Sequence, residues 1–305
     1  MKKRAKKNTK KVKDRDLIFY VLNIFFVFIT LYIVNFIALP QPSSLPFFVE
    51  YSHNKLSNEQ KLDLKKILTK GFVFNSDNQN IIFHGDRTKK MVALTFDADM
   101  TEGMVEMLKS GSVQSFYDGR LIQSLRESQT PATLFLAGKW TEVYPDETRN
   151  LASDPLFELG SHSYAHKSFT NSCYSLEPIA SDEKIQDIGT SQFLIEKYTG
   201  VKTKLFRFPG GCYSEDDLKL LKEAGMTTIQ WDVVGGDGFN PNPEAILSNI
   251  VNKTQNGSII VLHMNGFPNE PYDYLVVPQA VKILKEKGFE FVTISKLLEN
   301  YSIIK

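Results

Sequence analysis

The chain has 305 residues, 42% apolar and 23% charged, with 36 Lys and Arg against 35 Asp and Glu. This balance is typical of a folded protein and excludes wholesale disorder, collagen-like repeats and low-complexity sequence. The net charge of +1 hides an uneven distribution: residues 1–16 hold nine basic and two acidic side chains, and the other 289 residues hold 27 basic and 33 acidic ones. Because the body of the chain is acidic, the composition argues against a nucleic-acid partner.

An uncharged apolar segment, residues 17–39, directly follows the basic tail of residues 1–16. A helix of this length reaches about 34 Å, enough to cross a bilayer core of about 30 Å. A buried core helix would not need apolar residues around its whole circumference. A cleaved signal peptide, the weaker alternative, would need a shorter apolar region and an A-x-A-like site. With the positive-inside rule, we predict a single-pass signal anchor in the cell membrane, with the chain after residue 40 outside the cytoplasm.

Residues 40–88 are predicted to be a juxtamembrane linker and stem, rich in Pro and Ser up to residue 56, with helical spacing over 57–70. From residue 89 to 305, short β-rich runs alternate with helical patterns. We expect strands at 91–96, 132–137, 156–160, 205–209, 227–234, 258–263 and 289–294, and helices at 119–127, 181–198, 215–224, 243–254 and 278–287. Such alternation predicts a parallel β/α fold, either a doubly wound sheet or a barrel. In a barrel, reactive side chains lie at the carboxyl ends of the strands.

Two polar clusters at predicted strand ends have side chains that suit a metal ion. Asp97 and Asp99 end the first strand, and a pair of carboxylates can bind a divalent cation, or one can act as a base beside the metal. The pair is also explained by a turn, or by the D-x-D pattern of glycosyltransferases that use Mn²⁺ and a sugar nucleotide. His162 and His166 follow the strand at 156–160, and a spacing of four on a helical turn suits Zn²⁺.

Three further clusters also fall at strand ends. Arg207 closes the strand at 205–209, where a guanidinium can keep a carboxylate ionised and aimed, and the glycines after it let backbone N–H groups approach a substrate oxygen. Residues 232–237 carry two Asp after an apolar run, and His263 ends the strand at 258–263. Each cluster alone has a structural explanation as a turn or cap. Five such coincidences on one rim are improbable, so we predict an active site there.

The order of these motifs resembles the polysaccharide deacetylase family (NodB homology, carbohydrate esterase family 4) over residues 89–298. The resemblance implies a distorted (β/α)7 barrel that removes N-acetyl groups from peptidoglycan, chitin or related amino sugars with a divalent metal, commonly Zn²⁺. It also implies that Asp97 is the general base, held by Arg207, and that the backbone N–H of Gly210 is an oxyanion donor.

The remaining motifs of the family supply further expected roles. The resemblance implies that His162 and His166 bind the metal, that His263 is the general acid and that Asp237 tunes it. Leu262, in the reduced L-x-H motif, is expected to line the pocket for the acetyl methyl group.

The sequence departs from the family at two places. Ala98 stands where the family has its second Asp, the third metal ligand, and Asp99 is one residue further on. We predict that Asp99 joins the two histidines through a local change of the loop. The alternative is a site of the two histidines and water, which would bind a metal weakly. In the fourth motif, Val234 replaces the first Asp and Gly238 the Trp, which implies a substrate groove without an aromatic wall at that point.

The predicted function is metal-assisted hydrolysis of N-acetyl groups by a membrane-anchored enzyme. One alternative, prompted by Ala98 and Gly238, is an inactive carbohydrate-binding relative. The other is a D-x-D glycosyltransferase, which leaves the histidines and Arg207 without a role. Cys173 and Cys212 both belong to loops of the predicted rim, and an extracytoplasmic location permits a disulfide, which we predict. Two unrelated buried thiols are the alternative.

Overall fold

The computed structural model describes residues 81–265 and 272–299. The predicted basic tail, the membrane segment and the stem helix at 57–70 lie outside these ranges. Within them, no helix combines the length and the apolar character that crossing a bilayer requires.

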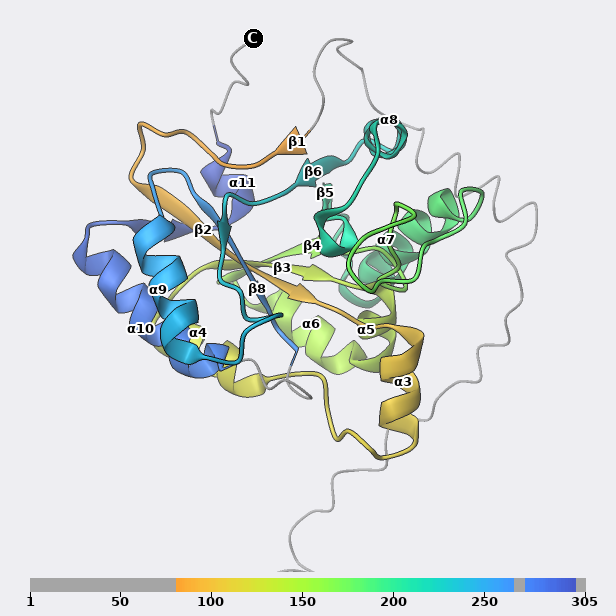
Figure 1. The fold of residues 1–305 in the computed structure, drawn as a ribbon, viewed down its shortest axis with the longest axis horizontal. Helices are drawn as coiled ribbons and strands as arrows, with labels where there is room; N and C mark the ends of the chain where they lie inside the picture. Colours follow the sequence, from red (N-terminus) through yellow and green to blue (C-terminus); the bar gives the residue numbers. More distant parts are fainter. Residues whose placement is uncertain (1–80, 266–271, 300–305) are drawn as a thin grey trace, which may run out of the picture. The chain divides into compact units, whose positions relative to one another are not determined.

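A curled sheet of parallel strands forms the centre of the fold (Figure 1). Its hydrogen-bonded path runs β1-β6-β5-β4-β3-β2-β8-β7, and β9 pairs with the amino end of β2. Among the described strands, the two ends of the path, β1 and β7, do not pair with each other, so the sheet is a half-barrel. The strands are β1 Ile81–Ile82, β2 Met91–Ala98, β3 Ala132–Leu136, β4 Phe157–Ser161, β5 Leu205–Phe206, β6 Thr227–Ile229, β7 Val233–Val234, β8 Ile259–His263 and β9 Glu290–Val292.

Helices cover the convex side of the sheet, with α4, α9 and α10 on one flank and α5, α6 and α7 on another (Figure 1). The described helices are α3 Glu102–Lys109, α4 Gly119–Glu127, α5 Gly138–Val143, α6 Pro145–Ser153, α7 Lys184–Thr199, α8 Glu215–Glu223, α9 Pro243–Lys253, α10 Asp273–Glu286 and α11 Ile294–Leu297. Their ends follow local chemistry. For example, the Ser214 hydroxyl accepts a hydrogen bond from the Asp217 N–H, and the Asp217 carboxylate accepts one from the Ser214 N–H, which begins α8.

The central strand β2 shows how the two layers of the core arise. Successive side chains of a strand point to opposite faces. Val92, Leu94 and Phe96 therefore pack outward in the large cluster shared with the helices, whereas Ala93 belongs to a smaller inner cluster. All of them are buried, which explains why β2 is a near-continuous apolar run, as expected for a central parallel strand.

The predicted strand at 227–234 is two strands that lie far apart in the sheet. β6 pairs with β5 and β1, whereas β7 pairs with β8 at the other end of the path. Residues 230–232 thus carry the chain across the open side of the half-barrel. The prediction of one strand was wrong because an apolar run does not show which strand each part of it pairs with. That pairing is decided by the tertiary structure.

Several helices were not predicted, namely α3, α5, α6 and α11, and α10 begins at Asp273 rather than at Pro278. Proline inside a helix removes one hydrogen bond. Here α10 continues through Pro278 because it buries Val276, Val277 and further apolar side chains against the core. Packing outweighs the local signal.

The predicted disulfide between Cys173 and Cys212 is confirmed. The two cysteines are 39 residues apart in the sequence. Closing a loop of this length stabilises the folded state by about 4 kcal/mol in the chain-entropy model. The bridge ties the loop after β4 to the segment after β5.

Candidate active site and metal centre

All the predicted site residues lie at the carboxyl ends of the strands. Asp97 and Asp99 are at the end of β2, His162 follows β4, Arg207 follows β5 and His263 ends β8. In the register of the sheet, Asp97 lies opposite His263 on the neighbouring strand. Because every strand is parallel, these ends meet on one rim, as the half-barrel requires.

The alternation of β2 explains how Asp99 can stand in for a ligand at position 98. Ala98 is the last residue of the strand, and its side chain packs outward in the large cluster with Phe96. Asp99 therefore lies on the same face as Asp97. A carboxylate at position 98 of this strand would be aimed into the apolar layer, whereas Asp99 is aimed at the histidines.

Asn265, which the sequence did not single out, holds the backbone of Asp99 in place. Its side-chain oxygen accepts a hydrogen bond from the Asp99 N–H at 2.8 Å, and its amide nitrogen donates to the Asp99 carbonyl at 2.7 Å. The side-chain amide of Asn265 thus pairs with both the backbone N–H and the backbone carbonyl of Asp99. This clamp fixes the backbone position of Asp99 beside the two histidines.

Asp99, His162 and His166 form a group that can hold a metal ion. Asp99 Oδ1 lies 3.4 Å from His162 Nε2 and 3.2 Å from His166 Nε2. Ligands of a tetrahedral Zn²⁺ at about 2.0–2.1 Å would be about 3.3 Å apart. Asp99 Oδ1, the atom that faces both histidines, is buried without a hydrogen-bond partner among the described residues. Buried polar atoms are rarely left so, and the residues present therefore fit a divalent cation.

The two histidines differ in how they are prepared for a metal. The His162 Nδ1–H donates to the Arg207 carbonyl at 2.9 Å, so Nε2 faces the site. Burial lowers the pKa of His162, but the negative charges of Asp97 and Asp99 outweigh it and raise that pKa. Burial lowers the pKa of His166 to about 4, which makes it a neutral imidazole with a free lone pair. A metal ion would displace the proton from His162 Nε2.

The segment from His162 to His166 is a tight turn rather than the helical turn that the spacing predicted. Ser163 and His166 have left-handed backbones, with φ of +64° and +53°. Asp187 on α7 accepts hydrogen bonds from the N–H groups of Tyr164 and Ala165 at 2.8 and 3.2 Å. Burial raises the pKa of Asp187 to about 6. This buried carboxylate, another residue that the sequence did not indicate, maintains a backbone that costs energy.

Arg207 holds Asp97 on the other side of the centre. The guanidinium is fully buried and its Nη1 donates to Asp97 Oδ1 at 2.7 Å. Its carbon lies 4.1 Å from the centre of the Phe135 ring and 5.4 Å from that of Trp231. Burial lowers the pKa of Arg207 and the Asp97 charge opposes that effect. Asp97 Oδ2 remains on the metal side, 3.7 Å from His162 Nε2.

His263 is paired with Asp237. Asp237 Oδ2 accepts hydrogen bonds from the backbone N–H of His263 at 2.6 Å and from its Nδ1 at 2.9 Å. Burial lowers the pKa of His263, but the charge and hydrogen bonds of Asp237 outweigh it and raise that pKa well above 6.5. The raised pKa favours a protonated His263, whose Nδ1–H is aimed at Asp237.

Asp273, at the start of α10, adds a second carboxyl group behind this pair. It is 1% exposed, and both of its oxygens lack a donor among the described residues. Burial and the negative charge of Asp237 raise the pKa of Asp273 well above its usual range. Two carboxylates cannot hydrogen-bond to each other, but a protonated Asp273 can donate to Asp237. The raised pKa of Asp273 favours its protonated form, which can act as this donor.

Gly210 and Leu262, the two residues predicted to contact substrate, lie in different surroundings. Gly210 has a left-handed backbone, with φ of +61°, and a Cβ there would come 2.7 Å from Cys173 Sγ, so only glycine fits this turn. Leu262 does not face the site. It packs outward in the large cluster, because the alternation of β8 sends it to the face opposite His263. Val261, in register with Thr95, is the neighbouring apolar residue on the site face, and the role expected of Leu262 is corrected accordingly.

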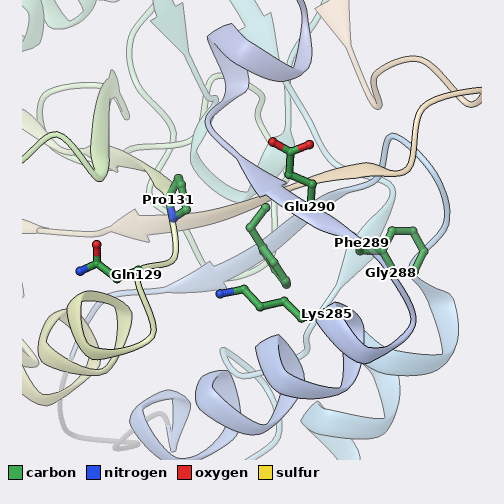
Figure 2. Close-up of a pocket in the computed structure, with 7 residues that line it drawn as sticks. Gln129, Pro131, Lys285, Gly288, Phe289 and Glu290 are labelled. Carbon is green, nitrogen blue, oxygen red and sulfur yellow. The ribbon is translucent and has the colours of Figure 1, made fainter.

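Other features of the chain lie away from this rim. Asp232, from the fourth motif, binds Arg87 and Ser258 near the amino end of β8. A hollow of about 540 Å³ also lies at the amino ends of the strands (Figure 2). Glu290, which lines it, pairs with Met91, the first residue of β2. Its lining is Gln129, Pro131, Lys285, Gly288, Phe289, Glu290 and Phe291, none of which belongs to the site.

Comparison with known proteins agrees with the fold and the motifs. Residues 84–229 match the family model described as polysaccharide deacetylase. A peptidoglycan-N-acetylglucosamine deacetylase of Bacillus cereus is 28% identical over 69% of this chain and 89% of its own length. YlxY, an uncharacterised protein of Bacillus subtilis, is 23% identical over 88% of this chain and 77% of its own.

A crystal structure of a CE4 family pseudoenzyme from Bacillus anthracis is also similar, with a TM-score of 0.59 and 26% identity. The match covers 73% of this chain and 70% of that one. The motifs, the half-barrel and these matches lead to one conclusion: residues 84–229 belong to the polysaccharide deacetylase family.

Proposed function

We propose that this chain is a membrane-anchored, metal-dependent deacetylase that hydrolyses N-acetyl groups of an amino-sugar glycan, with peptidoglycan as the first substrate to test. The observation that carries the proposal is the triad of Asp99, His162 and His166, whose facing atoms suit a cation, next to the Asp97–Arg207 pair. The B. cereus relative, named for its action on peptidoglycan, supports the substrate class.

The chain's own residues would divide the proton transfers between them. Asp99, His162 and His166 would hold the metal, which supplies Lewis-acid chemistry to carbonyl groups and water. Arg207 occupies Asp97 Oδ1, which leaves Oδ2 to accept a proton from the attacking water. The oxygen of the tetrahedral intermediate would accept a hydrogen bond from the Gly210 N–H, an interaction worth roughly 3 kcal/mol. His263 would donate its Nε2 proton to the departing amine, while Asp237 keeps its Nδ1–H.

The test is acetate release from peptidoglycan fragments and from chitooligosaccharides by the full-length chain, with and without a chelator. We expect release that stops with chelator, returns with Zn²⁺ and falls by roughly 10²- to 10⁴-fold in Asp97→Asn. Undiminished release by Asp97→Asn would show that the general base has been assigned wrongly. Release that persists in chelator would contradict the metal requirement.

A catalytically impaired relative is the second function to consider, because one similar solved structure is of a pseudoenzyme. In its favour, Ala98 stands where the resemblance places the third metal ligand, and the nearest carboxylate in the sequence, Asp99, is one residue further on. A chain that binds Zn²⁺ and glycan but releases no acetate would establish this alternative. No observation favours the D-x-D glycosyltransferase, since Asp97 is committed to Arg207 and Asp99 faces the histidines.

The membrane anchor in the proposal rests on residues 1–39 of the sequence alone. An alkaline phosphatase reporter, which is active only outside the cytoplasm, can be fused after residue 88. Activity of the fusion, recovered with the membrane fraction, is the expected result. An inactive or freely released fusion would contradict the anchored topology.

A further inference from the structure

Two exposed aromatic side chains meet at the carboxyl end of the half-barrel. Tyr174 and Phe239 are 70% and 72% exposed, the highest values among the exposed large apolar side chains of the described residues. Their ring centroids are 5.3 Å apart, with 40° between the ring planes. A contiguous pair of exposed rings gains little from burial in the folded chain, and such patches mark surfaces that contact something else.

The two rings come from loops on opposite sides of the open half-barrel. Tyr174 is in the turn after β4 that begins at Cys173, where the Leu176 N–H donates to the Cys173 carbonyl at 3.1 Å. Phe239 is in the turn after β7, where its N–H donates to the Gly236 carbonyl at 3.1 Å. β7 is one end of the sheet path, so the pair bridges two segments that the sheet itself does not join.

The backbone around Tyr174 costs energy to maintain. Tyr174 has a φ of +52°, a left-handed conformation that is unfavourable for a bulky residue. The disulfide of Cys173 with Cys212 holds this turn over the segment after β5. Tyr174 has an unfavourable backbone conformation that the neighbouring disulfide helps to maintain, and its ring nevertheless points into solvent. Such a costly arrangement suggests that the position of the ring is functional.

The Tyr174 ring, and the residue just before Phe239, lie next to groups with proposed catalytic roles. A Cβ at Gly210 would come 3.1 Å from Tyr174 Cδ2, so the tyrosine ring covers the turn that carries the oxyanion donor. A Cβ at Gly238 would come 3.0 Å from His263 Cε1, and Phe239 is the next residue. The sequence implied that Gly238 leaves the groove without an aromatic wall, but an exposed ring follows directly after it.

We propose that Tyr174 and Phe239 together form a platform that binds a sugar ring of the glycan beside the N-acetyl group undergoing hydrolysis. The inference rests on the proposed function. A pyranose ring presents a face of C–H groups that can stack on an aromatic ring while its hydroxyl groups stay in water. The tyrosine adds a phenolic hydroxyl that can bond to the sugar. The platform is built by this chain's own loops and needs no metal ligand.

The experiment measures binding of tetra-N-acetylchitotetraose by calorimetry, with full-length chains that also carry Asp97→Asn to stop turnover. Phe239→Ala and Tyr174→Asn remove the rings, and asparagine suits the left-handed backbone at position 174. Phe193→Ala is the matched control, because Phe193 is 54% exposed on α7 and away from the rim. Phe239→Trp restores an aromatic face. KM and kcat are compared for the same four changes in the active chain.

We expect Kd and KM to rise about tenfold for each ring removed, or about 1.4 kcal/mol, with little change in kcat. Phe193→Ala and Phe239→Trp should bind like the parent chain. Equal affinity in Phe239→Ala, Tyr174→Asn and the parent would overturn the platform, as would a parent that does not bind the tetramer. Acetate release with unchanged KM in both variants would reject the platform and keep the deacetylase. Binding that depends on the two rings, without acetate release, would support the platform and reject the deacetylase.

Discussion

The two ends of the sheet differ in how their polar side chains are paired. At the amino end, Asp232 accepts hydrogen bonds from Arg87 at 2.7 Å, from the Ser258 hydroxyl at 3.0 Å and from the Ile259 N–H at 2.8 Å. At the carboxyl end, Asp99 and His166 keep buried atoms without a partner, and the buried Asp273 oxygens meet no donor and can pair with Asp237 through a proton alone. Among the described residues, all the buried side-chain atoms without partners belong to these three.

The backbone shows a similar tendency among the described residues other than glycine. Of the four with a left-handed conformation, Ser163, His166 and Tyr174 belong to loops at the carboxyl end, whereas Gln129 precedes β3 at the amino end. Unpaired polar atoms and unfavourable backbones both cost stability, and they persist only where the surroundings enforce them. The difference indicates that the amino end serves the stability of the fold, whereas the carboxyl end is prepared for a ligand. The predictions below would sharpen or break this contrast.

The largest effect is expected from the loss of a metal ligand. Asp99→Ala should weaken Zn²⁺ binding by more than about 100-fold, because the change removes the carboxylate that faces both histidines. Equilibrium dialysis with elemental analysis measures it. Asp232→Ala removes a carboxylate at the amino end and should bind Zn²⁺ like the parent chain. Similar affinities for the two variants would contradict the metal centre.

The next effect concerns the clamp on Asp99. Asn265→Ala should weaken Zn²⁺ binding by about 10- to 100-fold, since the ligand stays but its backbone is no longer held. Asn256→Ala is the matched control, because its amide donates to the Arg87 carbonyl at the amino end. If the two asparagine variants have the same affinity, position 99 needs no support from Asn265.

A smaller effect is expected in the pH profile of acetate release. The raised pKa of His263 keeps this general acid protonated, so kcat/KM should fall only as pH rises through a value well above 6.5. Asp237→Asn removes the charge that raises this pKa, and the alkaline limb should move to lower pH. Asp273→Asn keeps a donor toward Asp237 and should retain the parent profile. If the alkaline limb of the pH profile does not move in Asp237→Asn, the ionisation that causes this limb is not that of His263.

The smallest effect on activity is expected at the amino end. Asp232→Ala leaves Arg87, Ser258 and Ile259 without their acceptor, and should lower the free energy of unfolding by about 1–3 kcal/mol. Acetate release at a temperature where the variant is folded should not change. Denaturant titration beside the activity assay measures both. A large loss of activity in the folded variant would break the contrast between the two ends.

Much of the site could be predicted because its residues follow strands. The apolar runs that end at Asp97, Arg207 and His263 are visible as buried parallel strands, and the carboxyl ends of such strands meet on one rim. The pairing of Cys173 with Cys212 could be proposed for the same reason. The residues that support the site could not be found in this way, because Asn265, Asp187 and Asp273 act from loops and helices whose distance from the site depends on folding.

The sequence by itself determined which polar residues follow which strand and the match to the family motifs. It also showed that the acidic residue expected at position 98 is found at Asp99. These features depend on local composition and spacing. Only the tertiary structure decided which face each side chain occupies. It sent Leu262 outward, aimed Asp99 inward, split residues 227–234 between the two ends of the sheet and brought Tyr174 against Phe239. The face that a side chain occupies and the residues that it contacts depend on strand register and on long-range strand pairing, which a local sequence pattern does not specify.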